Sequence, residues 1–360
     1  MEATWAPPDS PSYTAFFNAA RQGTVDEIRA AYTSEIDINA LQGDGFEGMS
    51  ALHLACFHNG DVEVVRFLLD HGAEVNILDR DRAGNSYSLH WAANRDRADI
   101  VKLLLDRGAE KSRKGFDGRN ALGMVLYYSL SPRKVEPKQM ETIQVLLDHG
   151  FSVDESGMDP SLLGHAAGFT DYETVSFSRH ELVKFLLSQG ASVNSLDDRL
   201  NTPLHLHVST SQPDERVVRL LLDAGADLSA RNTNGETPLL RAVSALHCPY
   251  QQGTPHDPQG SASVVLLRRL LGAGSDITAL DHLGQTALHI LASNSPACTP
   301  GECPEKAAQV LLDMGVPIDS LDNKGRTAID ILLEKHTIES RLILHTIENF
   351  KLHQHSPSSQ

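Results

Sequence analysis

The sequence is poor in cysteine, aromatic residues and basic charge, and it has no long apolar run. Four cysteines in 360 residues are too few for a secreted scaffold held together by disulfides, which favours a reducing compartment. No apolar stretch approaches the roughly 20 residues that span a bilayer. Residues 1–12 also lack the basic start and apolar centre of a secretory signal. We therefore expect a cytoplasmic protein, with the nucleus as the alternative.

Basic charge is outnumbered, and this excludes classes of partner. The chain carries 31 Lys and Arg against 47 Asp and Glu, a net charge of −16. This field repels polyphosphates and anionic membrane surfaces, so we expect neither nucleic acid nor membrane as a partner. Nucleotide-binding glycine loops, GxSxG and HExxH are also absent. We therefore expect no enzyme, no catalytic residue and no cofactor.

What the sequence does contain is a recurring segment. TPLHLHV begins at Thr202, and close variants begin at Thr237, Thr286 and Thr327. The end of the unit, LLDHGA from Leu68, returns as LLDRGA from Leu104. Thr-Pro starts a short helix, a second helix has aliphatic residues at helical spacing, and glycine closes it. Neither helix can bury its apolar face alone, so the units must stack.

These residues resemble the ankyrin repeat family, over about residues 13–352. The resemblance implies an all-α solenoid of helix pairs with β-hairpin-like fingers, forming a single elongated domain of about nine repeats including degenerate caps. Flexible segments, 1–12 and 353–360, would flank it. We expect a monomer. In this family the histidine of the TPLH-like motif ties neighbouring repeats together, which implies that role for His53, His90, His205 and His289.

Four repeats are longer than the others because of additions between their two helices. The interval from the first-helix leucine to the closing glycine is 19 residues for Leu89–Gly108 but 35 for Leu239–Gly274. The insertions lie at about 127–140, 169–180, 246–263 and 293–305. They form adjacent pairs on one edge of the predicted solenoid. Such insertions are typical of a binding edge, or of loop growth that costs little stability, and both interpretations stay open.

Three cysteines lie within the last two insertions. Cys298 and Cys303 have the spacing C-x₄-C, and Cys248 lies in the neighbouring loop. Thiolates with an imidazole satisfy tetrahedral zinc, although the spacing is looser than in a zinc finger. A regulatory disulfide and unreactive thiols are the alternatives. We expect no metal site and keep these three residues as candidates.

The candidate binding residues lie at finger tips and at the ends of first helices, which line the concave groove that the ankyrin family uses for partners. Trp91 stands where other repeats have an aliphatic residue, and Trp and Arg are enriched at interface hot spots. The alternative is that Trp91 packs under the next finger. The full set of predicted partner-binding residues is Arg80, Arg82, Trp91, Arg95, Phe57, His58, Arg199 and Arg241.

The predicted function is therefore a non-enzymatic protein–protein interaction module or scaffold. It would bind a partner through its concave surface and finger tips, and the basic cluster at Arg80 and Arg82 favours an acidic ligand for that patch. One alternative is an adaptor or inhibitor subunit of an enzyme complex such as a ubiquitin ligase or kinase. The other is a metal- or redox-responsive binder that uses the Cys298 and Cys303 loop.

Overall fold

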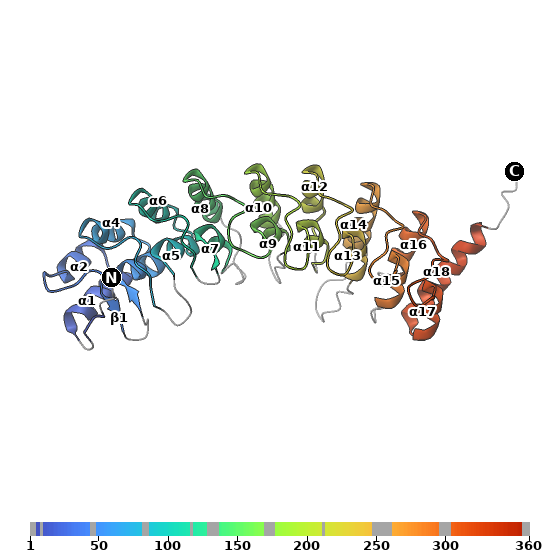
Figure 1. The fold of residues 1–360 in the computed structure, drawn as a ribbon, viewed down its shortest axis with the longest axis horizontal. Helices are drawn as coiled ribbons and strands as arrows, with labels where there is room; N and C mark the ends of the chain where they lie inside the picture. Colours follow the sequence, from blue (N-terminus) through green and yellow to red (C-terminus); the bar gives the residue numbers. More distant parts are fainter. Residues whose placement is uncertain are drawn as a thin grey trace. The chain divides into compact units, whose positions relative to one another are not determined.

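The described chain folds into paired helices that form two compact units, Met1–Leu162 and Leu163–Gln360. The computed structural model describes residues 5–7, 10–43, 48–80, 86–115, 118–127, 137–168, 177–210, 213–246, 261–294 and 304–354. Each unit is a stack of helix pairs joined by finger-like turns (Figure 1). The central parts of the four predicted insertions lie outside the described residues, and the predicted bounds of the repeat region stay a prediction.

The described residues of the first unit hold four helix pairs. In Figure 1 the second helices α2, α4, α6 and α8 form one row, and the first helices lie in another. The second repeat begins with a short α-helix that widens into a π-helical turn, η1. The pairs are α1 (Pro11–Gln22) with α2 (Val25–Ala31), α3 (Ala51–Leu54) and η1 (Ala55–Asn59) with α4 (Val62–Asp70), α5 (Ser88–Asn94) with α6 (Ala98–Asp106), and α7 (Ala121–Tyr127) with α8 (Pro137–Asp148).

The second unit repeats this arrangement with five pairs in its described residues. Its second helices again form their own row, α10, α12, α14 and α16 (Figure 1). The pairs are α9 (Leu162–Gly168) with α10 (Phe177–Ser188), α11 (Pro203–Val208) with α12 (Glu215–Asp223), α13 (Pro238–Ser244) with α14 (Ser261–Gly272), α15 (Ala287–Asn294) with α16 (Pro304–Asp313), and α17 (Ala328–Lys335) with α18 (Ile338–Gln354).

The repeat motif explains each first helix locally. At α11 the Thr202 hydroxyl accepts from the backbone N–H of His205 at 3.4 Å, and Pro203 occupies the first turn, where no N–H is needed. Leu204 follows at 0% exposure. The same motif buries Leu52 and Leu288, so the core is a continuous aliphatic layer between the two rows of each unit. Cys56 is also fully buried and belongs to this core.

The histidine of the motif bridges neighbouring repeats, as the family resemblance implied. Its Nδ1 accepts from the backbone N–H of the helix cap, which leaves the Nε2–H to donate to a carbonyl of the next finger. For His205 this carbonyl is that of Glu236, at 3.0 Å. His53, His90 and His289 make the same bridge to Ile77, Arg113 and Arg326, at 3.2, 3.2 and 3.0 Å.

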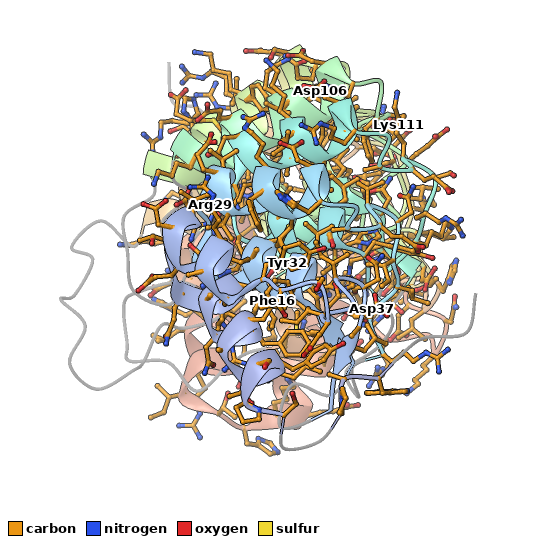
Figure 2. All side chains as sticks on the ribbon, turned by 90° about the vertical axis from the view of Figure 1, so that its left-hand side faces the viewer. Phe16, Arg29, Tyr32, Asp37, Asp106 and Lys111 are labelled. Carbon is orange, nitrogen blue, oxygen red and sulfur yellow. The ribbon has the colours of Figure 1, made fainter. Side chains whose placement is uncertain are left out.

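A short hairpin precedes the second repeat. Strands β1 (Leu41–Gln42) and β2 (Met49–Ser50) are antiparallel, with Leu41 opposite Ser50. At the N-terminal end of the first unit, Phe16 is fully buried and its ring lies 5.8 Å from that of Tyr32. Figure 2 shows Phe16 and Tyr32 near the centre of this end, with Arg29 and Asp37 nearer its margins. Within the described residues, none of the helices combines the length and apolar character that a membrane span requires.

Candidate protein-binding surface

The fingers of the second unit use an acidic or amide side chain to hold their own turns. In the second unit, one carboxylate oxygen of Asp197 accepts from the backbone N–H groups of Arg199 and Asn201 at 2.9 and 2.7 Å. Asp281 and Asp322 make the equivalent pairs of bonds at 2.8–2.9 Å. The bond from the Arg326 backbone N–H is the main cause of the lowered pKa of Asp322. These carboxylates therefore cap the turns of their fingers.

Backbone bonds join successive fingers into one surface. In the second unit, the N–H of Thr233 donates to the carbonyl of Arg199 at 2.9 Å, and that of His282 donates to Asn234 at 3.0 Å. The N–H of Asn323 donates to Leu283 at 3.0 Å. These bonds satisfy main-chain groups, so the side chains at the tips are left for other contacts.

Asparagines add a second connection at the base of the fingers. The Asn76 amide donates to the carbonyl of Gly108 at 3.0 Å, and its oxygen accepts from the N–H of Glu110 at 2.9 Å. Asn39 and Asn194 make the same two contacts with their next repeats. These asparagines are therefore structural cross-links between repeats.

Trp91 lies beneath the predicted binding surface. Its side chain is 7% exposed, and the indole Nε1–H donates to a carboxylate oxygen of Asp79 at 2.6 Å. Asp79 is fully buried and also accepts from the backbone N–H of Ser86 at 2.7 Å. The indole thus ties helix α5 to the finger that precedes it. The alternative placed Trp91 under the next finger, whereas the indole is buried against the preceding one.

Three of the predicted residues join Trp91 in one cluster. The Phe57 ring packs edge-on against Trp91, with centroids 4.8 Å apart, and edge-on against the His58 ring, with centroids 4.6 Å apart. The Arg95 guanidinium lies 5.0 Å from the Phe57 ring centre, and its Nε donates to the Phe57 carbonyl at 3.0 Å. Burial, with the positive charges of Arg21 and Arg95, lowers the pKa of His58. The cluster is half-buried and presents neutral rings and one cation.

The remaining predicted arginines have different surroundings. Arg80 and Arg199 are exposed at finger tips, and in the described residues neither guanidinium has a carboxylate within ion-pair distance. Arg241 is different, because it lies 3.7 Å from the buried carboxylate of Glu236. Arg82 lies outside the described residues.

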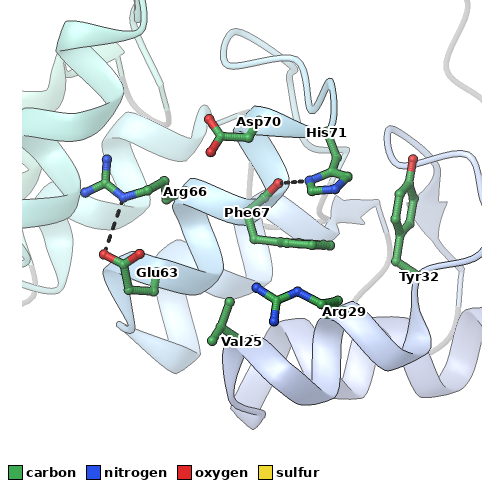
Figure 3. A pocket seen from close by; sticks show the side chains of 8 residues that line it. All are labelled: Val25, Arg29, Tyr32, Glu63, Arg66, Phe67, Asp70 and His71. Atoms are coloured by element: carbon green, nitrogen blue, oxygen red, sulfur yellow. Dashed lines mark hydrogen bonds and ion pairs between the residues drawn. The ribbon is translucent and has the colours of Figure 1, made fainter.

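A pocket on the second-helix row was missed by sequence reasoning. It lies between α2 and α4, with a volume of about 470 Å³, and Phe67 and Tyr32 form its apolar part (Figure 3). The charged groups around it are engaged, since Arg66 bonds Glu63 at 3.3 Å and Asp70 pairs with Arg107 at 2.8 Å. The sequence did carry a signal for this pocket, because Phe67 and Tyr32 are two aromatic residues in a chain with few aromatics.

No cluster of three or more His, Cys, Asp or Glu side chains suited to a metal occurs among the described residues. The metal candidates Cys248, Cys298 and Cys303 lie outside that part of the chain. The two helix-end histidines with the DHG motif are structural. His71 and His149 each donate from Nδ1 to a carbonyl four residues earlier, at 2.7 Å.

Comparisons with known proteins identify the repeats. A family model described as "Ankyrin repeat" matches residues 47–80 and 86–115, and one described as "Ankyrin repeats (3 copies)" matches residues 172–250. Together with the stacked helix pairs, these matches confirm that the chain is an ankyrin-repeat protein with an all-α solenoid fold. Ankyrin repeats are protein-interaction modules, and this chain is therefore a protein-interaction module.

Several curated relatives carry the name of an enzyme. The chain is 27% identical to "Putative palmitoyltransferase ZDHHC13" of Danio rerio, over 65% of this chain and 33% of the relative. It is 31% identical to "Palmitoyltransferase ZDHHC13" of Mus musculus, over 55% of this chain and 29% of the relative. "Palmitoyltransferase AKR1" of Lachancea kluyveri is 28% identical, over 66% of this chain and 30% of the relative. The matched region thus spans about a third of each relative.

These names correct one sequence-based prediction. The absence of nucleotide-binding and hydrolase motifs led to the expectation that the chain is not an enzyme, and relatives named palmitoyltransferases contradict it. The expectation failed because short motifs cover only the chemistries that they encode. An acyltransferase need not carry a nucleotide-binding loop, GxSxG or HExxH.

Proposed function

We propose that this ankyrin-repeat chain recognises a protein partner through its finger tips and the exposed ends of its first helices. One observation supports this most directly. The groups that hold the fingers together are satisfied internally, whereas exposed tip cations such as Arg80 and Arg199 have no ion pair within the described residues. A cation left without an internal partner at a rigid tip contributes to recognition at little structural cost.

The ligand favoured by these tips is acidic. The protein carries a net charge of −16, so a tip cation is a local exception to the long-range field. It selects for a carboxylate at short range while the rest of the surface repels anions that cannot make the contact.

The test is affinity capture from cell extract on the immobilised chain, with the captured proteins quantified by mass spectrometry. The test variants are Arg80→Glu and Arg199→Glu. The matched controls are Lys102→Glu on α6 and Lys184→Glu on α10, which reverse exposed cations on the second-helix row. We expect the tip variants to lose proteins that the wild type and the controls retain. If the wild type, the two tip variants and the two controls all captured the same proteins, tip recognition would be contradicted.

A second candidate follows from the three relatives. The chain would act as the protein-recognising part of a palmitoyltransferase, so that its partner is also the protein that receives the acyl group. Cells supplied with an alkyne-labelled palmitate provide the assay. Proteins captured by the wild-type chain should be enriched in label compared with those captured by Arg80→Glu. Equal labelling of the two sets would count against this candidate while leaving tip recognition intact.

A further inference from the structure

The fingers of the second unit expose an unusual number of leucines. Leucines at the repeat anchors, such as Leu204 and Leu288, are fully buried. Five finger leucines are instead 42–61% exposed, and we call them the leucine strip: Leu196, Leu200, Leu280, Leu283 and Leu321. Single exposed leucines are common on proteins, but a set at related positions is not. The described finger residues of the first unit expose no large hydrophobic side chain to this degree.

Three members of the strip occupy corresponding places. Leu196, Leu280 and Leu321 each stand directly before the aspartate that caps the turn of their finger. The backbone bonds that join successive fingers align these positions along one edge of the unit. Stacked helices lie about 8–10 Å apart, so the three repeat steps from Leu196 to Leu321 cover about 24–30 Å.

Leu200 has an unfavourable backbone conformation, and burial of its side chain does not compensate for it. Its φ is +58°, in the left-handed region that side chains with a Cβ rarely adopt. The corresponding residues of the next three fingers are Gly235, Gly284 and Gly325, with φ of +76°, +70° and +74°. The Leu200 side chain nevertheless remains 44% exposed. Strain that persists without a packing benefit indicates a functional constraint.

Positive charge accompanies the leucines. Arg199 and Lys324 lie at the same tips as strip leucines, and Arg231 lies on the finger between Leu200 and Leu280. None of the three has an ion pair in the described residues. The Arg231 guanidinium is fixed by bonds to the carbonyls of Gly235 and Leu280, which hold its position without neutralising its charge. The edge therefore combines fixed apolar groups with cations in a protein whose net charge is −16.

We infer that the leucine strip binds an acidic amphipathic segment of the partner protein, an inference that rests on the proposed function. Aliphatic side chains of the segment would cover the leucines, and its carboxylates would pair with the tip cations. A helix that covers about 24–30 Å has about 16–20 residues, at 1.5 Å per residue. A protein segment fits this edge because a row of separate apolar points requires a ligand with side chains at matching intervals.

The experiment uses a displayed library of random 20-residue peptides, selected on the full chain and sequenced. We expect selected peptides to be enriched in Leu, Ile, Met and Phe together with Asp and Glu. The test variant is Leu196→Ser with Leu283→Ser and Leu321→Ser. The matched control, Leu333→Ser with Leu352→Ser, changes leucines on α17 and α18 that are 52% and 67% exposed. A selected peptide should bind the test variant at least about tenfold more weakly and the control unchanged, since each buried leucine contributes roughly a tenfold effect.

Two further variants separate recognition from stability. Leu200→Asn keeps a residue tolerated at positive φ, so it should weaken peptide binding without lowering the melting temperature. Arg199→Glu with Lys324→Glu should remove the preference for acidic peptides. A lower melting temperature with unchanged binding for Leu200→Asn would show that the leucine is structural and would overturn its role in the strip.

Other outcomes overturn the inference in distinguishable ways. Selected peptides that bind the test variant normally but lose affinity for Arg80→Glu would leave the proposed function standing and refute the strip. A library that yields no binder would count against both. Leucine-dependent binding to phosphatidylserine-containing vesicles, without peptide binding, would identify a lipid contact. Leucine-dependent dimerisation measured by light scattering would identify a second copy of the chain as the occupant.

Discussion

Replacing Trp91 by phenylalanine tests the buried connection between helix α5 and its finger. The change removes the indole N–H, and with it the 2.6 Å bond to the fully buried carboxylate of Asp79. Hydrogen bonds to charged groups contribute about 1.5–3 kcal/mol to stability. The smaller ring also loses packing against Phe57, which adds about 1 kcal/mol. The expected loss is therefore about 2.5–4 kcal/mol in the unfolding free energy of the first unit.

The assay is urea denaturation followed by far-UV circular dichroism, which does not depend on tryptophan emission. The protein provides its own control, because its other tryptophan, Trp5, is 46% exposed. Trp5→Phe should change stability by less than about 0.5 kcal/mol. In a double-mutant cycle with Asp79→Asn, the two changes should be less than additive by about 1.5 kcal/mol or more. Trp91→Phe costing no more than Trp5→Phe, with an additive cycle, would refute the reasoning.

Three further predictions concern the scaffold. Burial lowers the pKa of His53 to about 3 and that of His90 to about 4, so the unfolded chain binds more protons between about pH 4 and 6.5. Stability should therefore fall as the pH drops through that window, and a melting temperature constant from pH 7 to 4.5 would contradict this. Asn76→Ala loses both bonds to the next repeat and should lower the free energy of unfolding by about 1 kcal/mol, measured by urea denaturation. No change would show that the asparagine is only solvated. Gly60→Ala should cost about 1–3 kcal/mol, because φ is +74° and the added Cβ would meet the Arg97 guanidinium. Gly272→Ala, where the added Cβ meets nothing within 4 Å, should be neutral or stabilising by about 0.5 kcal/mol, and equal losses for the two would refute the strain argument.

The parts of the fold that repeat were predictable from the sequence. Helix starts at Thr-Pro, helix ends at glycine and the bridging role of His205 depend on local chemistry that each repeat carries with it. The turn-capping role of Asp197 was predictable for the same reason.

Features that depend on a single tertiary contact were not predictable. Trp91 has the residue type of an interface hot spot, yet a bond to the buried carboxylate of Asp79 holds it inside the protein. Local sequence does not reveal that bond. The exposed leucines were missed because leucine in a repeat protein usually belongs to the core. Only the structure shows that the leucine before a capping aspartate points away from the core.

The internal satisfaction of the fingers has a consequence for evolution. Because each turn is held by its capping side chain and each finger by its neighbour's backbone, a substitution at a tip such as Arg199 or Leu283 leaves those bonds in place. Preference for a new partner can therefore change by one residue at a time, with the folded state preserved at every intermediate. Gene duplicates of such a chain can diverge quickly in what they recognise while their cores stay nearly the same.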